Sequence, residues 1–196
     1  MRGVENMPPK SKVSKEKIIE AAFEIAKKNG FSKVTARNVA KHLGCSVAPI
    51  YVNFETIDDL ISAVVKRVFA LSNELLAKQS GENMFENIGK ASLEFARDYP
   101  ILFRELVIEP NQYMKSYEEF EETMLQAMSE DKEISSLTFE ERRKLLFKMR
   151  VFQLGLSVMV ANGHIPSYLD EKAVEKLLME TGEELLQIQK SKKGDS

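Results

Sequence analysis

The spacing of apolar residues predicts helices along almost the whole chain. Between Ser14 and Asn29, apolar residues recur every three or four positions from Ile18, as expected for one buried helix face, and Gly30 supplies the stop. No segment of about four to eight residues alternates as a strand does, so the predicted fold is all-α. Later segments with a helical pattern or start signal are Thr56 to Lys78, Glu82 to Tyr99, Ile101 to Glu109, Lys115 to Ser129, Thr138 to Asn162 and Asp170 to Gln189.

Residues 35–54 predict two short helices joined by a glycine turn. Thr35 can cap the first helix, Gly44 ends it where a positive φ is needed, and Ser46 is expected to cap the second helix. Two helices arranged in this way form a helix-turn-helix, whose second helix enters the major groove of DNA. The motif therefore makes DNA reading the leading hypothesis.

The charge is divided unevenly along the sequence. Residues 1–54 hold ten Lys and Arg against four Glu, a net charge of +6, which leaves −8 for the remainder. A basic segment that carries the motif, followed by an acidic body, is expected when one part meets phosphates, although such imbalances also arise by chance. The 43% hydrophobic and 30% charged residues fit a globular protein of one or two domains.

Several other classes of protein are disfavoured. No apolar run reaches the roughly 18 residues that span a bilayer, and the polar N-terminus lacks a secretory signal, so we expect a cytoplasmic protein without a membrane partner. With one cysteine, Cys45, and two histidines, His42 and His164, neither a disulfide within the chain nor a Cys/His metal site is expected, and we predict no cofactor. The absence of a phosphate-binding glycine loop argues against an enzyme, and the run Glu118 to Glu122 fits a solvated helix face.

A series of apolar, glycine, capping and aromatic positions extends over residues 14–65. Its members are Ala21-Ala22, Asn29-Gly30-Phe31, Thr35, Val39-Ala40, Leu43-Gly44-Cys45-Ser46, Ile50-Tyr51-Val52-Asn53-Phe54 and Asp59-Leu60. This order resembles the DNA-binding domain of TetR-family transcriptional repressors. The resemblance implies a homodimer that places the second motif helix of each subunit in a major groove. It also implies a C-terminal domain that binds a small molecule and thereby releases the DNA.

The resemblance and the helical pattern together predict a three-helix DNA-binding domain followed by a helical ligand-binding and dimerisation domain. The expected segments are a basic flexible arm at 1–13, the helix-turn-helix domain at 14–56, a connecting helix at 57–78, the helical domain at 79–190 and a flexible tail at 191–196. The chain departs from the family at Ile57, where a lysine usually clamps a phosphate, and at Asn53, where histidine is usual. We therefore expect either weaker electrostatic attraction to DNA than is usual or an operator recognised partly through its shape.

The first residues of the second motif helix should lie nearest the base edges. They carry no side-chain hydrogen-bonding groups, so direct readout from this helix should rest on thymine methyl groups. Arg37 is the best candidate for a base-specific hydrogen bond, with contact to a phosphate or solvent as the alternative. For Tyr51 the alternative to a phosphate contact is ring packing within the motif. The predicted DNA-binding residues are Lys33, Thr35, Arg37, Ser46, Val47, Ala48, Pro49, Tyr51, Val52 and Asn53.

The central helices are rich in aromatic and methionine side chains, which line adaptable pockets and also fill ordinary cores. Arg97, Arg104 and Arg150 could meet an anionic head group. We expect an unknown small-molecule effector of apolar or amphipathic character. The residues chosen as its binding site are Phe95, Tyr99, Phe103, Phe120, Met124, Phe152 and Met159.

The last two long helices are the predicted dimer interface. Residues 154–161 are apolar around nearly the whole circumference of a helix, which a core within one subunit does not require. The final helix carries a matching stripe at Val174, Leu177, Leu178, Leu185 and Ile188. Two helices from each subunit would form a four-helix interface, and a two-fold dimer predicts a palindromic operator.

The sequence thus predicts a ligand-responsive transcriptional regulator. The favoured version is a repressor that binds double-stranded DNA as a homodimer and is released by its effector. The alternative is a helix-turn-helix protein that acts through protein contacts, with weak or no sequence-specific DNA binding.

Overall fold

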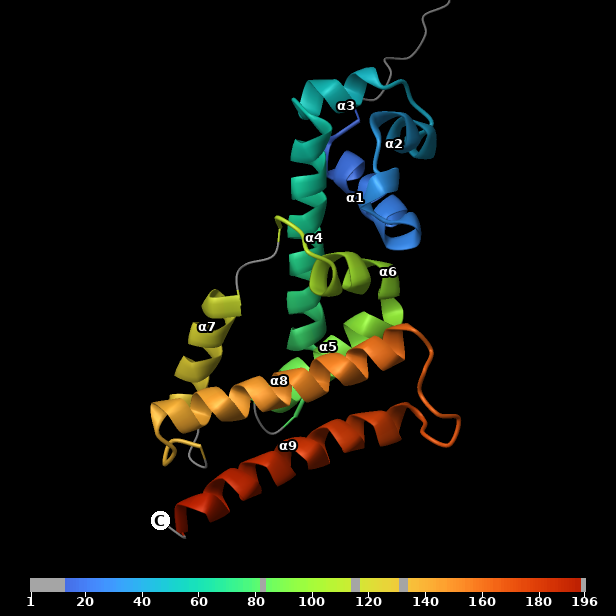
Figure 1. Ribbon diagram of the computed structural model, residues 1–196. Helices are drawn as coiled ribbons and strands as arrows, with labels where there is room; N and C mark the ends of the chain where they lie inside the picture. The colour runs from blue at the N-terminus through green and yellow to red at the C-terminus, as the bar shows by residue number, and fades with distance from the viewer. Residues whose placement is uncertain (1–12, 82–83, 114–116, 131–133, 195–196) are drawn as a thin grey trace, which may run out of the picture. The chain divides into compact units, whose positions relative to one another are not determined.

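The computed structural model describes residues 13–81, 84–113, 117–130 and 134–194, and these residues form helices and connections without a strand (Figure 1). The predicted all-α fold is confirmed. None of the described helices combines the length and apolar character needed to cross a membrane. The basic arm lies, except for Val13, outside the described residues. The elements are α1 (Lys15–Asn29), η1 (Phe31–Lys33), α2 (Ala36–Leu43), α3 (Ala48–Asn53), α4 (Ile57–Ala77), α5 (Met84–Asp98), α6 (Pro100–Phe103), η2 (Arg104–Ile108), α7 (Tyr117–Glu130), α8 (Phe139–Ala161) and α9 (Glu171–Gly194).

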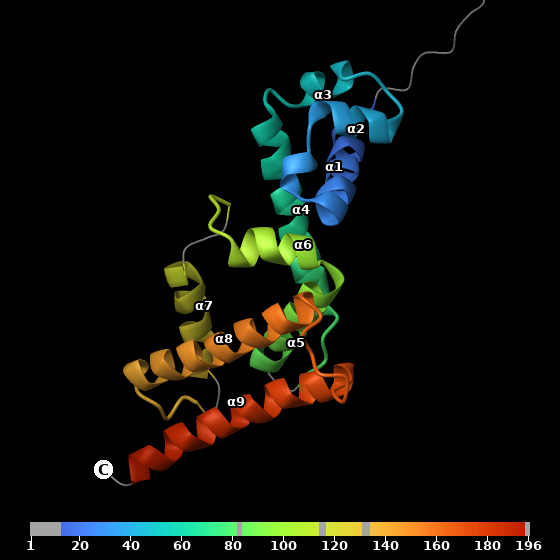
Figure 2. The same cartoon turned by 45° about the vertical axis from the view of Figure 1, so that its right-hand side comes forward.

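The chain forms two compact units, Met1–Val68 and Phe69–Ser196, and the division falls inside α4. In the N-terminal unit, α1, α2 and α3 pack against one another (Figures 1 and 2). Each of these helices and α4 contributes side chains to one core. The fully buried residues of this core include Ile18, Ala22, Ala26, Val39, Ile50, Leu60 and Val64.

An ion pair adds a link between the first and fourth helices of this unit. Arg67 of α4 donates from Nε to Oε1 of Glu20 in α1 at 2.8 Å. The same guanidinium lies 5.1 Å from the ring centroid of Phe23, so it also makes a cation–π contact with α1. The contacts link the middle of α4 to α1.

The predicted starts and stops of the motif helices are largely confirmed. Thr35 accepts a hydrogen bond from the Asn38 amide at 3.2 Å and so caps α2. Gly44 ends α2 with φ at +66°, and the Cys45 amide donates to the Ala40 carbonyl, the long bond of a Schellman-type turn. At the start of α4, Thr56 and Asp59 exchange backbone-to-side-chain bonds of 2.9 and 3.1 Å.

The prediction that Ser46 caps the second motif helix is wrong. The cap residue of α3 is Val47, and no side chain caps the helix. A capping side chain accepts from the second or third helical amide. With Ser46 as the cap, these amides would be those of Ala48 and Pro49, and Pro49 has no N–H. Ser46 therefore remains an exposed turn residue.

In the C-terminal unit, α8 is the central element, since it contacts α5, α7 and α9. A complete capping box between Thr138 and Glu141 opens this helix. One apolar cluster joins α7 to the first turns of α8, and a second joins α5, α8 and α9. The buried members of the first are Met124, Leu125, Met128, Ile134, Leu137, Leu145 and Leu146, and those of the second are Leu93, Leu156, Val174 and Leu178.

The segment predicted as one helix from Ile101 to Glu109 is divided in the structure. Pro100, expected only to close the preceding helix, occupies the first turn of α6, where its missing N–H leaves no intrahelical hydrogen bond unmade. From Arg104 to Ile108 the chain forms a π-helix. The side-chain amide nitrogen of Asn111 lies 3.0–3.1 Å from the carbonyl oxygens of Glu105, Leu106 and Glu109. One side chain therefore donates hydrogen bonds to carbonyl groups at the end of this segment.

We predict that Gly44→Ala destabilises α2 and α3 locally by about 1 to 2 kcal/mol, the cost of a left-handed conformation for a residue with a Cβ. The added Cβ would meet nothing within 4 Å, so the cost is conformational rather than steric. Gly44→Asn should cost less, because asparagine adopts this conformation more readily. Amide hydrogen exchange in the two helices measures the effect.

A matched control is Gly155→Ala in α8, where an added Cβ also meets nothing within 4 Å but φ is not positive. This change should be neutral or stabilise α8 by about 0.5–1 kcal/mol. Equal losses in Gly44→Ala and Gly155→Ala would contradict the conformational explanation.

Candidate functional site

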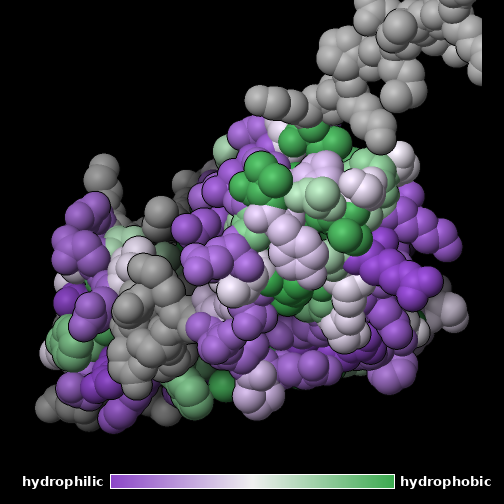
Figure 3. Space-filling model, turned by 90° about the horizontal axis from the view of Figure 1, so that it is seen from above, coloured by the Kyte–Doolittle hydropathy of each residue, from purple (hydrophilic) through white to green (hydrophobic). Residues whose placement is uncertain are grey.

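The second motif helix has one buried and one outward side. Ile50 is fully buried and Phe54, directly after the helix, is 5% exposed, so these two side chains fasten α3 to the core. The outward side carries Val47, 43% exposed, Tyr51, 56% exposed, and Val52, 83% exposed. Seen from the end that carries α3, hydrophobic groups lie among hydrophilic ones on this face (Figure 3). The outward side is therefore available to a binding partner.

The polar groups of α3 are few. Asn53 donates its side-chain amide to the Pro49 carbonyl at 2.7 Å and is half-buried, so its N–H is engaged within the helix. Tyr51, in contrast, is more than half exposed, which leaves its hydroxyl accessible. Between Ala48 and Asn53 the helix contains no charged residue.

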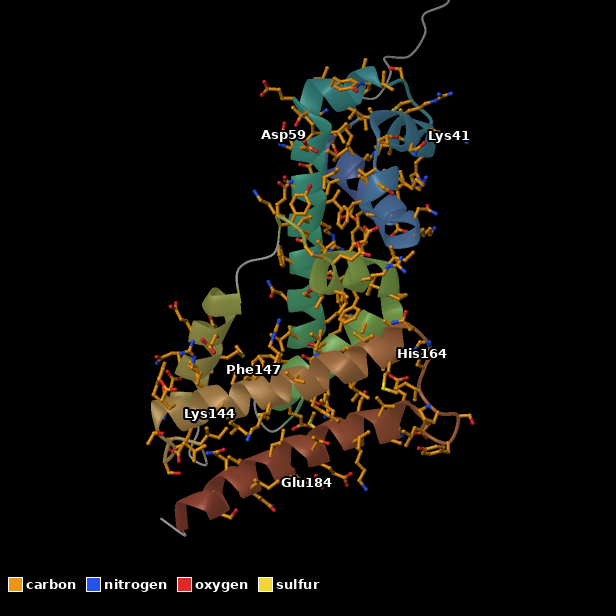
Figure 4. The ribbon with its side chains drawn as sticks, viewed as in Figure 1. Lys41, Asp59, Lys144, Phe147, His164 and Glu184 are labelled. Atoms are coloured by element: carbon orange, nitrogen blue, oxygen red, sulfur yellow. The ribbon has the colours of Figure 1, made fainter. Side chains whose placement is uncertain are left out.

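The positive charge beside α3 comes from the preceding helix. Arg37 and Lys41 are both exposed and, four residues apart, share one face of α2. Lys41 extends outward from the helix (Figure 4). Arg37 forms no hydrogen bond or ion pair with the residues that the structure describes. Lys33 and Thr35 are exposed just before α2, so this edge of the unit presents cations and a hydroxyl.

The start of α4 carries two carboxylates, those of Asp58 and Asp59. Asp58 is exposed, whereas Asp59 accepts hydrogen bonds from the amide and the hydroxyl of Thr56 (Figure 4). Both carboxylates lie at the positive end of the helix dipole, which stabilises their negative charge. For a polyanionic partner, however, they oppose the attraction of the cations on α2.

A separate cavity of about 780 Å³ lies within the C-terminal unit, lined mainly by α5, α8 and α9. Two of the predicted ligand residues, Met124 and Phe152, line it. Sequence reasoning missed the contribution of α9, which includes Leu185 and Leu186, because that helix was assigned to the dimer interface. Glu86 on α5 also lines the cavity and accepts a hydrogen bond from Lys90, which raises the pKa of Lys90 above its ordinary value.

The other predicted ligand residues lie elsewhere. Phe95 and Phe103 are buried but do not line this cavity, and Tyr99 stacks on Phe95 with 5.7 Å between ring centroids. Met159 is 40% exposed on α8. The side chain of Phe120 lies outside the described residues. Among the described residues, no group of three or more His, Cys, Asp or Glu side chains is arranged to hold a metal ion.

Comparison with known proteins identifies the N-terminal unit. Residues 18–64 match the family model of bacterial regulatory proteins of the tetR family. No curated protein matches the chain.

Two solved structures share the fold. A TetR-family transcriptional regulator from Haemophilus influenzae is 18% identical with a TM-score of 0.52, and the match covers 84% of this chain and 93% of that one. The fatty acid degradation regulator FadR from Bacillus halodurans is 14% identical with a TM-score of 0.54, and the match covers 92% and 97%. Residues 18–64 therefore match a helix-turn-helix domain of the tetR family, and the chain as a whole shares the fold of these two regulators.

Proposed function

We propose that the protein is a repressor that binds a palindromic operator as a homodimer and leaves it when a small apolar or amphipathic molecule binds. The DNA-binding part of the proposal is supported by the outward surface of the motif. There, Arg37 and Lys41 share a face of α2 beside an exposed and uncharged α3. Cations at the edge of a groove-binding helix meet phosphates, while the helix meets bases.

Individual contacts can be assigned within this proposal. Arg37 makes the base-specific hydrogen bond, since a guanidinium can bind guanine in a bidentate manner. Tyr51 donates its exposed hydroxyl to a phosphate, and Thr35 and Ser46 offer further hydroxyl donors. Lys33 adds charge without sequence preference. Asn53 contributes least, because its amide already donates to Pro49.

The dimer interface is proposed on the outer face of α8. Phe147, Val151, Leu154 and Val158 follow one another at intervals of four, three and four residues and therefore form a single stripe. Phe147 and Val151 are each 57% exposed, and Figure 4 marks Phe147 on this helix. An apolar stripe of this length on a described surface is stabilised when a second copy covers it.

The predicted stripe on the final helix is only partly available for such a dimer. Val174 and Leu178 are buried against α5 and α8, and Leu185 packs on the α7–α8 cluster. Leu177 and Ile188 are exposed. In the proposed interface, α9 therefore contributes these two residues beside the stripe of α8.

The effector site is proposed in the cavity of the C-terminal unit. Its lining combines apolar side chains such as Met149 and Phe152 with polar ones such as Gln153 and Thr181. A volume of about 780 Å³ is within the range of small-molecule sites. This mixture favours an amphipathic molecule.

One other function is favoured by a specific observation. The carboxylates of Asp58 and Asp59 and the apolar surface of α3 also suit a helix-turn-helix that binds a protein rather than DNA. A mobility-shift assay with DNA from upstream of the gene encoding this chain separates the two. Absence of sequence preference at every salt concentration would reject the repressor proposal.

We predict that Arg37→Ala weakens operator binding by about 1 to 3 kcal/mol and relaxes the preference at one position in each half-site. Mobility shifts with operators altered one position at a time measure both effects. Lys41→Ala is the matched control on the same face of α2. It should weaken binding to all sequences alike and reduce the slope of log K against log salt by about 0.9. A uniform loss in Arg37→Ala would make Arg37 a phosphate contact.

We predict that Val151→Asp converts the dimer to a monomer, because it places a carboxylate in each copy of the proposed stripe. Light scattering coupled to size exclusion measures the mass, and the variant should bind a full palindrome no better than a half-site. Tyr168→Asp is the control, since Tyr168 is 81% exposed between α8 and α9, outside the stripe. An unchanged mass of Val151→Asp would place the interface elsewhere.

We predict that Phe152→Ala weakens binding of the effector about tenfold or more, by removing an aromatic wall of the cavity. The ligand is identified first, by mass spectrometry of small molecules retained on the purified protein, and its affinity is then measured by calorimetry. Met159→Ala tests a predicted ligand residue outside the cavity and should leave the affinity unchanged. The opposite ranking of the two variants would exclude the cavity as the effector site.

A further inference from the structure

The outward surface of α3 is apolar to an unusual degree for a helix that meets DNA. Val52 is 83% exposed, the highest value among the exposed large hydrophobic residues of the described chain. Ala48 lies one turn before it and is also exposed, and Val47 precedes the helix with 43% exposure. These three residues, which we call the apolar ridge, make no contribution to the buried core of the unit.

The helix offers no alternative group for reading base edges by bidentate hydrogen bonds. It contains no Arg, Lys, Gln, Asp or Glu, and its one amide side chain, Asn53, donates to the Pro49 carbonyl. In the major groove, the feature that complements an apolar surface is the methyl group at C5 of thymine. The other base-edge groups there are hydrogen-bond donors or acceptors, which an aliphatic side chain would leave unsatisfied.

The spacing of residues in the apolar ridge allows it to contact more than one methyl group. Ala48 and Val52 are four residues apart on one helix face, which separates their Cβ atoms by roughly 5 to 6 Å. Successive base pairs rise by about 3.4 Å. The ridge can therefore cover methyl groups on pyrimidines one or two steps apart.

We propose that the apolar ridge recognises the C5-methyl group of pyrimidines, so that 5-methylcytosine satisfies it as thymine does. The inference rests on the proposed insertion of α3 into the major groove. Cytosine and thymine differ there in the exocyclic group at C4 and in the methyl group at C5. The ridge has no hydrogen-bonding group for the substituent at C4. The presence of the C5-methyl group therefore determines how well each pyrimidine binds to the ridge. Methylation of cytosine in an operator would then strengthen binding at these positions.

The test begins with an operator selected from random duplexes by the full-length protein. Each thymine of one half-site is replaced in turn by deoxyuridine, which removes only the methyl group. We expect one or two positions at which the dissociation constant rises about fourfold, the effect of exposing one methyl group. At the same positions, cytosine should be at least as unfavourable, and 5-methylcytosine should bind about fourfold better than cytosine.

A variant assigns the methyl contact to the ridge. Val52→Thr keeps the side-chain shape and replaces one methyl group by a hydroxyl, and the high exposure of Val52 leaves the core intact. In this variant, the ratio between the uracil and thymine operators should fall toward one at the position that Val52 contacts. Lys28→Ala on α1, an exposed residue outside the motif, should retain the full ratio.

Two results would overturn the inference, and only the second of them would also reject the proposed function. If a selected operator binds with sequence preference but is unaffected by uracil at every position, the ridge does not read methyl groups, while the proposed DNA binding stands. If no operator can be selected, the proposed function fails as well.

Discussion

A helix of six residues cannot hold its own shape in water, so α3 depends on the burial of Ile50 and Phe54. Burying each side chain contributes on the order of 1.5 to 3 kcal/mol. Lys15 of α1 lies 5.0 Å from the centroid of the Phe54 ring and adds a cation–π contact to it. Because the inward side is fixed, the outward side is fixed too, and the orientation of Val52 follows from the packing of Ile50.

In the proposed DNA complex, the electrostatic contribution comes from α2 rather than from α3. Arg37 and Lys41 supply charge on one face, whereas the carboxylates at the start of α4 reduce it. Affinity that depends on few phosphate contacts falls less steeply with salt than affinity based on many. In the proposed complex, the fit between base edges and the apolar ridge therefore supplies more of the sequence preference.

The sequence predicted best those helix starts and ends that depend on hydrogen bonds or backbone conformations of neighbouring residues. The cap at Thr35 and the left-handed Gly44 each involve residues within a few positions of one another, and so does the box observed between Thr56 and Asp59. The cap at Ser46 failed because Pro49 removes the amide that it would have bound. The π-helix was missed, since helical periodicity does not reveal the hydrogen bonds that Asn111, outside the helical segment, donates to its carbonyls.

The candidate effector site was the least predictable part, for a different reason. An aromatic residue becomes part of a cavity only when the helices facing it leave space, and periodicity does not specify which helices those are. Phe103 and Phe152 look alike in the sequence, yet Phe103 is buried elsewhere and Phe152 faces α9 across the cavity. A Cβ on Gly89 of α5 would come within 2.8 Å of Cδ2 of Leu178, which shows how closely α5 and α9 pack there.

The proposed effector site and dimer interface meet in a single helix. Leu146 and Met149 of α8 line the cavity, and Phe147 and Val151 stand on the opposite side of the same turns. A molecule that separates α9 from α8 would alter the position of Leu177 and Ile188 beside the stripe. Half-site spacing in a two-fold dimer is set by the interface. In the proposed function, the short path from cavity to interface would let the effector change operator affinity through the dimer.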